Sequence, residues 1–231
     1  MALFDRPLSL MVSLPANDPE LAAAAAAGGA DALKTHINVG HRASGTVFGS
    51  IEEERGGLTG VLEVGLATGL VVGGAGAVDR EQMAVARDLG FAFFDVYAQH
   101  APAWYVQAAG DRLAMAAVGH DDVLERATGL PALGIGAVEA SLCPPEGYHT
   151  PLTLDLLADV ARLVSLVDIP VVVPTQRAIH PDDVPGVAAT GAAALLIGAV
   201  VTGTEPDGVR ATTAAFRRAM DALPTSTGGT T

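Results

Sequence analysis

The chain has 231 residues, of which half are apolar and 4 % are aromatic, and it carries a formal net charge of −13. This length and apolar content suffice for one large hydrophobic core. The negative charge disfavours nucleic acid and anionic membranes as partners, because their phosphate groups would be repelled. No apolar run reaches the roughly 18 residues that a membrane span requires. The alanine-rich run at 22–27 follows acidic residues, unlike a signal peptide. We therefore expect a cytoplasmic protein.

Strand and helix patterns alternate along the first half of the chain. Short apolar runs predict strands at 8–14, 32–37, 70–73 and 91–97. Helices are predicted at 18–28, 50–63, 79–89 and 102–109. Ser50 and Glu53 have the spacing of a capping box at the start of the second helix. The segment 38–49 before that helix is predicted to be a loop, long enough to act as a lid over a bound molecule.

The alternation continues through the second half. Strands are predicted at 113–118, 132–138, 169–173 and 193–197, and helices at 121–127, 152–166 and 206–223. A further helix begins at His180-Pro181-Asp182-Asp183, where proline and carboxylates suit a first turn, and ends at Gly191. The last strand is followed directly by Gly198 and Ala199.

Eight strands and eight helices in alternation predict a (β/α)8 TIM barrel at residues 1–223. No linker or change of composition divides this range, so we expect a single domain. The Thr/Gly/Ser-rich tail at 224–231 is predicted to be disordered. A doubly wound open sheet is the alternative fold. It would need a glycine-rich turn after the first strand, and the sequence Leu-Pro-Ala-Asn-Asp at 14–18 lacks one.

Lys34 is the most informative polar residue at the predicted mouth of the barrel, because it is the only lysine and lies in an apolar strand. The alternation of a strand puts Lys34, His36 and Asn38 on one side. Burial would lower the pKa of Lys34 and make it a nucleophile or base. It could form a Schiff base, or donate to an enolate or phosphate oxygen. The alternative is a lysine on the outer face of the barrel that extends between helices.

Two carboxylates are the candidate partners of Lys34. Asp95 lies inside a buried strand and therefore needs a partner, and Glu139 directly follows the predicted strand 132–138. We predict that the Lys34 amine lies within salt-bridge reach of one of them and that both exchange protons with a substrate. The alternatives are a barrel-filling ion pair for Asp95 and a helix cap or surface position for Glu139. Asn17 and His36, at the ends of the first two strands, are predicted to bind substrate.

Arg177 and the turn at Gly198 and Ala199 are the predicted phosphate site. Arginine can hold a phosphate through two parallel hydrogen bonds, and a glycine lets the backbone approach an anion. The histidines show neither HxH nor HExxH spacing, and Cys143 is the only cysteine, which also excludes an internal disulfide framework. We therefore expect no metal and no cofactor.

The segment 169–203, IPVVVPTQRAIHPDDVPGVAATGAAALLIGAVVTG, resembles the last quarter of phosphate-binding TIM barrels of the ribulose-phosphate-binding type. It is most similar to the N-acylglucosamine-6-phosphate 2-epimerases. Arg177 matches that family's arginine with one residue inserted, and 198–202 matches its Gly-x-Ala-Ile-Thr turn. The family's catalytic lysine after the third strand is replaced here by glycine and alanine at 73–75. Lys34 instead resembles the second-strand lysine of the (5-formylfuran-3-yl)methyl phosphate synthases.

The residues and the resemblance together predict an isomerase or epimerase of a small phosphorylated compound, acting by proton abstraction next to a carbonyl. Lys34, Asp95 and Glu139 would be catalytic. Two alternatives stay open: a Schiff-base lyase or aldolase that uses Lys34, and a non-catalytic regulator that binds a phosphorylated metabolite. Carboxylates at several strand ends favour an enzyme, because simple binding needs fewer of them. The oligomeric state stays open, and a homo-oligomer is compatible with the sequence.

Overall fold

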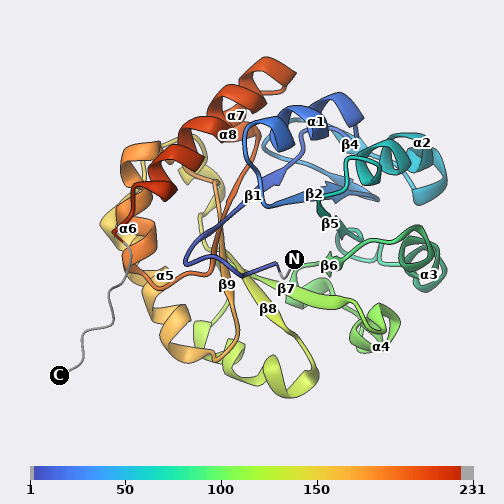
Figure 1. Cartoon of the computed structure of the whole chain (residues 1–231). Helices are drawn as coiled ribbons and strands as arrows, with labels where there is room; N and C mark the ends of the chain where they lie inside the picture. The colour runs from blue at the N-terminus through green and yellow to red at the C-terminus, as the bar shows by residue number, and fades with distance from the viewer. Residues whose placement is uncertain (1–2, 225–231) are drawn as a thin grey trace.

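A computed structural model describes residues 3–224, and its centre is a closed barrel of eight parallel strands (Figure 1). The strands are β1 (Ser9–Ser13), β2 (Ala32–His36), β5 (Ala67–Val71), β6 (Phe93–Asp95), β7 (Leu113–Gly119), β8 (Ala137–Ser141), β9 (Val171–Pro174) and β10 (Ala194–Ile197). Around the ring their order is β1-β10-β9-β8-β7-β6-β5-β2, which places β2 and β8 opposite each other. The predicted (β/α)8 barrel is confirmed.

Helices surround this barrel (Figure 1). They are α1 (Pro19–Ala27), α2 (Ile51–Leu62), α3 (Arg80–Leu89), α4 (Tyr105–Ala109), α5 (Leu154–Leu166), α6 (Val184–Ala189), α7 (Ala199–Thr202) and α8 (Pro206–Asp221). The predicted helix at 121–127 is wrong. Two 3-10 turns, Leu124–Gly129 and Pro131–Leu133, occupy the connection between β7 and β8. The amide of Asp122 donates to the carbonyl of Gly119, and its carboxylate accepts from the amide of Gly119 at 2.6 Å, so the chain forms a turn where the helix was predicted to begin.

Local signals set most helix boundaries. Ser50 and Glu53 form the predicted capping box at the start of α2. The Asp79 side chain accepts a hydrogen bond from the Gln82 amide and caps α3, which ends at the left-handed Gly90. The largest error in a predicted strand concerns β8, which begins five residues later than expected, after the turn at Gly134. Glu139 therefore lies within β8 instead of beyond it.

The segment after β2 is a small β-hairpin, so the expectation of a plain loop at 38–49 is wrong. The strands β3 (Val39–Gly40) and β4 (Val47–Phe48) pair antiparallel, with Val39 opposite Phe48. The amide of His41 donates to the carbonyl of Thr46 and closes the turn between them. The Thr46 hydroxyl donates to the carbonyl of Pro15 at 2.8 Å, which ties the hairpin to the loop after β1.

The barrel interior consists of layers, because every second residue of a strand points inward. An apolar layer contains Met11, Ala32, Phe93, Met115, Ala137, Val172, Ala194 and Leu196. Two residues further along β2, β6 and β8 lie Lys34, Asp95 and Glu139. These three therefore rest on an apolar floor and face the carboxyl end of the barrel.

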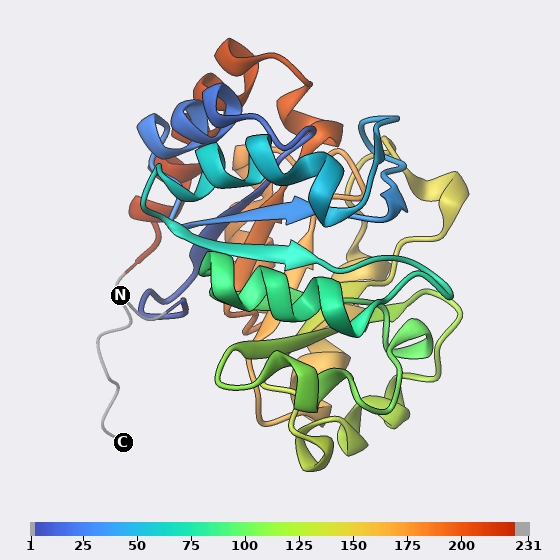
Figure 2. The same cartoon turned by 90° about the vertical axis from the view of Figure 1, so that its right-hand side faces the viewer.

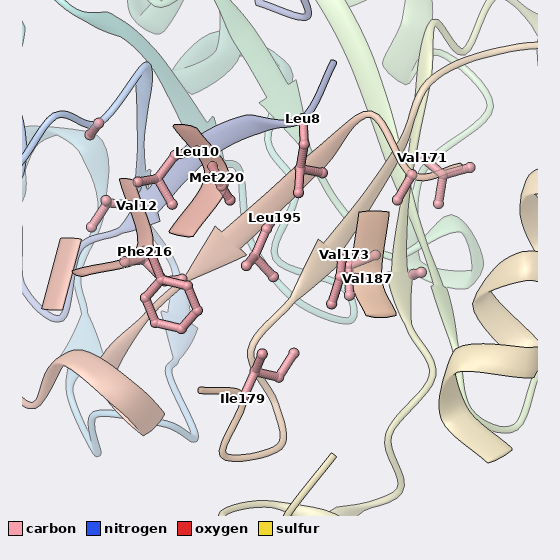
Figure 3. Packing of buried hydrophobic residues seen from close by; sticks show 14 of the residues in the cluster. Leu8, Leu10, Val12, Val171, Val173, Ile179, Val187, Leu195, Phe216 and Met220 are labelled. Atoms are coloured by element: carbon pink, nitrogen blue, oxygen red, sulfur yellow. The ribbon is translucent and has the colours of Figure 1, made fainter. Parts of the chain in front are cut away.

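The outward faces of the strands pack against helices. Figure 3 shows one part of this packing, in which Leu10, Val12 and Leu195 lie among Val187, Phe216 and Met220. All six side chains are at most 5 % exposed. This packing holds α6 and α8 against β1 and β10, at close-packed density.

Within residues 3–224, no helix is long and apolar enough to cross a membrane. The predicted disordered tail lies outside the described residues from position 225 onward. One domain at 1–223 remains a prediction.

Candidate active site

A cavity of about 340 Å³ opens at the carboxyl ends of the strands. Its walls come from the strand ends, from the hairpin after β2 and from the segment after β8. In Figure 2 both segments, drawn in blue and yellow, lie at the end to which the arrows of β2 and β5 point. The charged residues that line it, besides histidines, are Lys34, Arg42, Asp95 and Glu139. Chemistry in this fold is located at this end of the barrel.

The floor of the cavity is a buried ion triad. The Lys34 ammonium lies 2.9 Å from Oδ2 of Asp95 and also donates a short hydrogen bond to Oε2 of Glu139. The three side chains are only 3–8 % exposed. The predicted salt bridge of Lys34 is therefore present, and it includes both candidate carboxylates. The catalytic roles of the three residues stay predictions.

Burial shifts the pKa values of Lys34 and Glu139 in opposite directions. For Lys34, burial alone would lower the pKa, but the charges of Glu139 and Asp95 outweigh it and raise the pKa above its usual value. For Glu139, burial raises the pKa to about 7, although the Lys34 charge opposes this. We conclude that Lys34 is a cation at neutral pH, since two carboxylates surround it. Glu139 can then gain or lose a proton near neutrality.

Each member of the triad keeps bonding capacity for a ligand. An ammonium has three N–H donors, and Lys34 uses two of them on the carboxylates. Oδ1 of Asp95 is buried and has no hydrogen-bond partner among residues 3–224. Oε1 of Glu139 accepts a hydrogen bond from the Ser141 hydroxyl at 2.9 Å. The site therefore offers a fixed cation and two carboxylates of different environment.

His36 lies above Lys34 on the same side of β2, as predicted, and lines the cavity. Its ring stacks on Phe48 at 4.9 Å between centroids and lies 4.5 Å from the ring of His41. Burial, then His41 and Lys34, lower the pKa of His36 well below its usual value. Burial and Lys34 lower the pKa of His41 to about 4. Both rings are neutral at pH 7, and Nδ1 of His36 has no hydrogen-bond partner in the part of the chain that the structure describes.

Asn17 does not line the cavity, and its predicted contact with substrate stays a prediction. Its Nδ2 donates to the carbonyl of His36 and to Oε2 of Glu54, both at 2.8 Å. Its Oδ1 accepts from the amide of His36 at 3.3 Å. With its amide group bonded on both sides, Asn17 joins the loop after β1 to β2 and α2.

Arg177 also lies outside the cavity lining, so direct contact with a ligand there is not supported. Its guanidinium donates to the Thr150 hydroxyl at 2.5 Å and to the carbonyl of Pro151 at 3.4 Å, and these bonds direct it to the loop after β8. Gly198 lines the cavity, but its amide already donates to the Thr175 hydroxyl at 2.9 Å. Ala199 is buried and does not line the cavity.

Several lining residues were not among the predicted site residues. The Gln176 side chain accepts from the amide of Cys143 at 3.1 Å and donates to the hydroxyl of Tyr148 at 3.0 Å. Arg42, in the turn of the hairpin, has its guanidinium carbon 5.5 Å from the centre of the Tyr148 ring. No sequence motif marks this contact, because it depends on the hairpin reaching across the barrel mouth.

Histidine, cysteine and acidic side chains do not gather into a group of three that could hold a metal ion anywhere in residues 3–224.

Comparison with known proteins shows the fold and no more. No family model matches the chain, and no curated protein matches it. Among solved structures, thiamine phosphate pyrophosphorylase from Pyrococcus furiosus is similar, with 19 % identity, a TM-score of 0.65 and coverage of 93 % of this chain and 96 % of that one. Phosphoribosyl anthranilate isomerase from Thermus thermophilus has 15 % identity, a TM-score of 0.67 and coverage of 94 % and 100 %.

A third similar structure is tryptophan synthase from M. tuberculosis, with 14 % identity, a TM-score of 0.69 and coverage of 92 % of both chains. Similarity at these identities establishes the shared (β/α)8 barrel, while function has to be argued from the site. The 2-epimerase family suggested by the sequence is not among the matches described here, and the resemblance remains a proposal.

Proposed function

We propose that this protein is an enzyme that moves a proton next to the carbonyl group of a small phosphorylated compound, as an isomerase or epimerase. The observation that carries the proposal is the buried triad, in which one lysine lies between two carboxylates on the floor of the cavity. A cation beside groups that can take and return a proton is the arrangement that enolisation requires.

In the proposed reaction, the carbonyl oxygen of the substrate accepts the third N–H of Lys34. Glu139 takes the proton from the neighbouring carbon, and the C–H electron pair forms a C=C bond while the carbonyl oxygen becomes negative. Lys34 stabilises that oxygen. Epimerisation requires Asp95 to enter the cycle protonated: it then gives its own proton to the opposite face of the same carbon, and exchange with water returns Glu139 and Asp95 to their starting states. Return of the proton to the adjacent carbon gives isomerisation.

The raised pKa of Glu139, about 7, suits this role because a base with a pKa near the working pH is the most effective. Lys34 has the opposite property. As a cation between two carboxylates it is a poor nucleophile, so the triad favours an electrophilic role over Schiff-base formation. The lyase or aldolase therefore remains the second candidate.

The phosphate of the substrate is supported by the resemblance of 169–203 to phosphate-binding barrels. The three similar structures include two whose names contain a phosphorylated group, thiamine phosphate pyrophosphorylase and phosphoribosyl anthranilate isomerase. They are compatible with the proposal, although identity below 20 % establishes the fold only.

The direct test is hydrogen exchange in D2O, followed by proton NMR on a panel of phosphorylated aldoses, ketoses and 2-oxo acids. We expect the wild-type protein to replace the hydrogen next to the carbonyl of at least one compound with deuterium. Lys34→Met and Glu139→Gln should abolish this exchange, and Arg80→Gln, on the outer helix α3, should retain it. A panel without any exchange would contradict the proposed reaction.

Treatment with borohydride in the presence of the same compounds separates the second candidate. An electrophilic lysine gives no covalent adduct. A reduced adduct on Lys34, found by mass spectrometry, would instead favour the Schiff-base lyase.

A further inference from the structure

Arg42 is a cation at the cavity, and no carboxylate of the described residues pairs with it. It lines the cavity from the turn of the hairpin between β3 and β4. Within residues 3–224 its guanidinium has no ion-pair or hydrogen-bond partner, whereas other arginines bond to carboxylates: Arg6, Arg55, Arg112, Arg162, Arg210 and Arg217. Five further arginines of the described residues also form no ion pair with a carboxylate, but Arg42 is the arginine that lines the cavity.

The other cation of the cavity, apart from histidine, is Lys34, and it is already held by Asp95 and Glu139. The two carboxylates balance or exceed its charge, depending on the proton of Glu139. Arg177, which the sequence suggested as the phosphate ligand, bonds to Thr150 and Pro151 outside the cavity lining. An anionic group entering the cavity therefore meets one guanidinium with all its donors available.

Arg42 is held in place by an aromatic platform. Its guanidinium carbon lies 5.5 Å from the centre of the Tyr148 ring, within the range of a cation–π contact. The Tyr148 hydroxyl accepts a hydrogen bond from Gln176, whose side-chain oxygen accepts the amide of Cys143. This chain of contacts fixes Tyr148 on the loop after β8. A guanidinium stacked by its face keeps its N–H groups at the edge free for an anion.

The hairpin gives Arg42 its position over the site. At its base, Phe48 is 3 % exposed and stacks on His36, which lies two residues beyond Lys34 on the same face of β2. At its turn, Arg42 reaches the loop after β8, the strand opposite β2 in the ring. The cavity thus lies between the triad at its floor and Arg42 in the hairpin above it.

We propose that Arg42 binds the anionic group of the substrate and so determines specificity for an anionic carbonyl compound. The proposal rests on the proposed function, since it takes the carbonyl of the same molecule to lie at Lys34. Arg42 replaces Arg177 as the cation for that group. The chemistry is bidentate recognition of an oxyanion by a guanidinium, which phosphate and carboxylate share.

The first test is a titration of the isotopically labelled full chain with inorganic phosphate, and separately with acetate, followed by NMR chemical shifts. We expect phosphate to shift the signals of the hairpin and of Tyr148. Arg42→Gln should weaken phosphate binding at least about tenfold. Stronger binding of acetate than of phosphate would identify a carboxylate as the natural group, and would still support the anion site.

Three variants separate the explanations. Arg80→Gln is the matched control, because Arg80 also lies over an aromatic ring, 4.7 Å from the centre of Trp104, but does not line the cavity. It should bind phosphate like the wild type, and so should Arg177→Gln. Tyr148→Leu, which removes the platform, should weaken binding, whereas Tyr148→Phe keeps the ring and should retain most of it.

Two results would overturn the assignment: absence of phosphate and acetate binding to the wild-type chain, or unchanged binding in Arg42→Gln. Arg42 is exposed and has no hydrogen bond within the described residues, so its replacement should leave the fold intact. The deuterium-exchange assay keeps the two proposals apart. If Arg42→Gln still exchanges hydrogen and still prefers phosphorylated over unphosphorylated compounds, the role of Arg42 is refuted and the proposed reaction stands. If the wild type binds phosphate through Arg42 but exchanges no hydrogen, the proposed reaction is refuted and the anion site stands.

Discussion

Lys34 and Glu139 meet in the middle of the barrel although their strands, β2 and β8, lie on opposite sides of the ring. Each side chain points inward from a fully buried strand, and Asp95 approaches Lys34 from β6 at 2.9 Å. The buried Lys34 ammonium thus connects β2, β6 and β8 in the layer directly above the apolar layer of the barrel. The contact serves both the folding of the barrel and the proposed chemistry, and the two roles can be separated by mutation.

Replacement of Lys34 by methionine should destabilise the protein as well as inactivate it. The variant leaves Asp95 and Glu139 buried without their cation, and breaking a buried ion pair costs about 3–5 kcal/mol. Urea unfolding at pH 7 measures this loss. The triple variant Lys34→Met, Asp95→Asn, Glu139→Gln removes the unpaired charges and should regain much of the stability, but none of the deuterium exchange. Full stability of Lys34→Met would show that the triad is not a closed ion cluster.

The pH dependence of the proposed reaction should report Glu139. The pKa of this carboxyl is raised to about 7, and the base must be ionised, so the rate should rise with pH through that value and then level off. Ser141→Ala removes the hydroxyl that donates to Oε1, a bond that favours the charged form, so the midpoint should move to higher pH. A midpoint that stays in place would argue against Glu139 as the base.

Ser13→Ala is the control for this experiment. Ser13 lines the same cavity from β1, but it forms no hydrogen bond with Glu139. Its replacement should leave the midpoint of the profile where the wild type has it. A shift as large as that of Ser141→Ala would mean that the change reflects general repacking of the cavity.

The barrel and its charged floor could be predicted from the sequence because both depend on local patterns. Alternating apolar segments specify the strands and helices, and the period of two in a strand places Lys34 and His36 on one face. Lys34 as the only lysine, one carboxylate inside a predicted strand and another directly after a predicted strand then suffice to suggest an ion cluster. The hairpin could not be predicted, because β3 and β4 have two residues each and are stabilised by contacts with Pro15 and His36.

Arg177 and Asn17 illustrate the second limit of the sequence. Both follow strands at the mouth of the barrel, where polar residues often bind ligands. Which way such a side chain turns depends on hydrogen-bond partners that are distant in sequence, Thr150 for Arg177 and Glu54 for Asn17. The same holds for Arg42, whose contact with Tyr148 joins residues 106 positions apart in the sequence. Contacts between residues this far apart cannot be deduced from the composition of one sequence or from the spacing of its residues.

Gly69, in the layer below the site, has no room for a larger residue. Gly69 of β5 lies against Phe93, and a Cβ placed on it would be 2.0 Å from a ring carbon of Phe93. Gly69→Ala should therefore overpack the apolar floor and destabilise the barrel by about 1–3 kcal/mol or more. Thermal unfolding measures the effect. The double variant Gly69→Ala, Phe93→Leu should recover part of the loss, whereas additive losses would show that the ring is not the cause.

Acid should destabilise the cover of the cavity through His41 and His36. The pKa of His41 is lowered to about 4 and that of His36 lies well below its usual value, so the unfolded chain binds more protons than the folded chain between these folded-state values and pH 6.5. Their contribution to stability is therefore complete above pH 6.5 and is lost as the pH falls through the folded-state values. For His41 this amounts to about 3 kcal/mol at most.

Glu139 opposes this trend, and the difference makes the prediction specific. Its raised pKa means that the folded chain holds a proton that the unfolded chain has lost between about pH 4.5 and 7, so stability falls there as the pH rises. Urea unfolding between pH 7 and 4 should show a net loss toward acid in the wild type, a smaller loss in His41→Asn and a larger loss in Glu139→Gln. His180→Asn, at an exposed position, is the control and should follow the wild type. An equal acid loss in His41→Asn would show that the hairpin does not depend on a neutral His41.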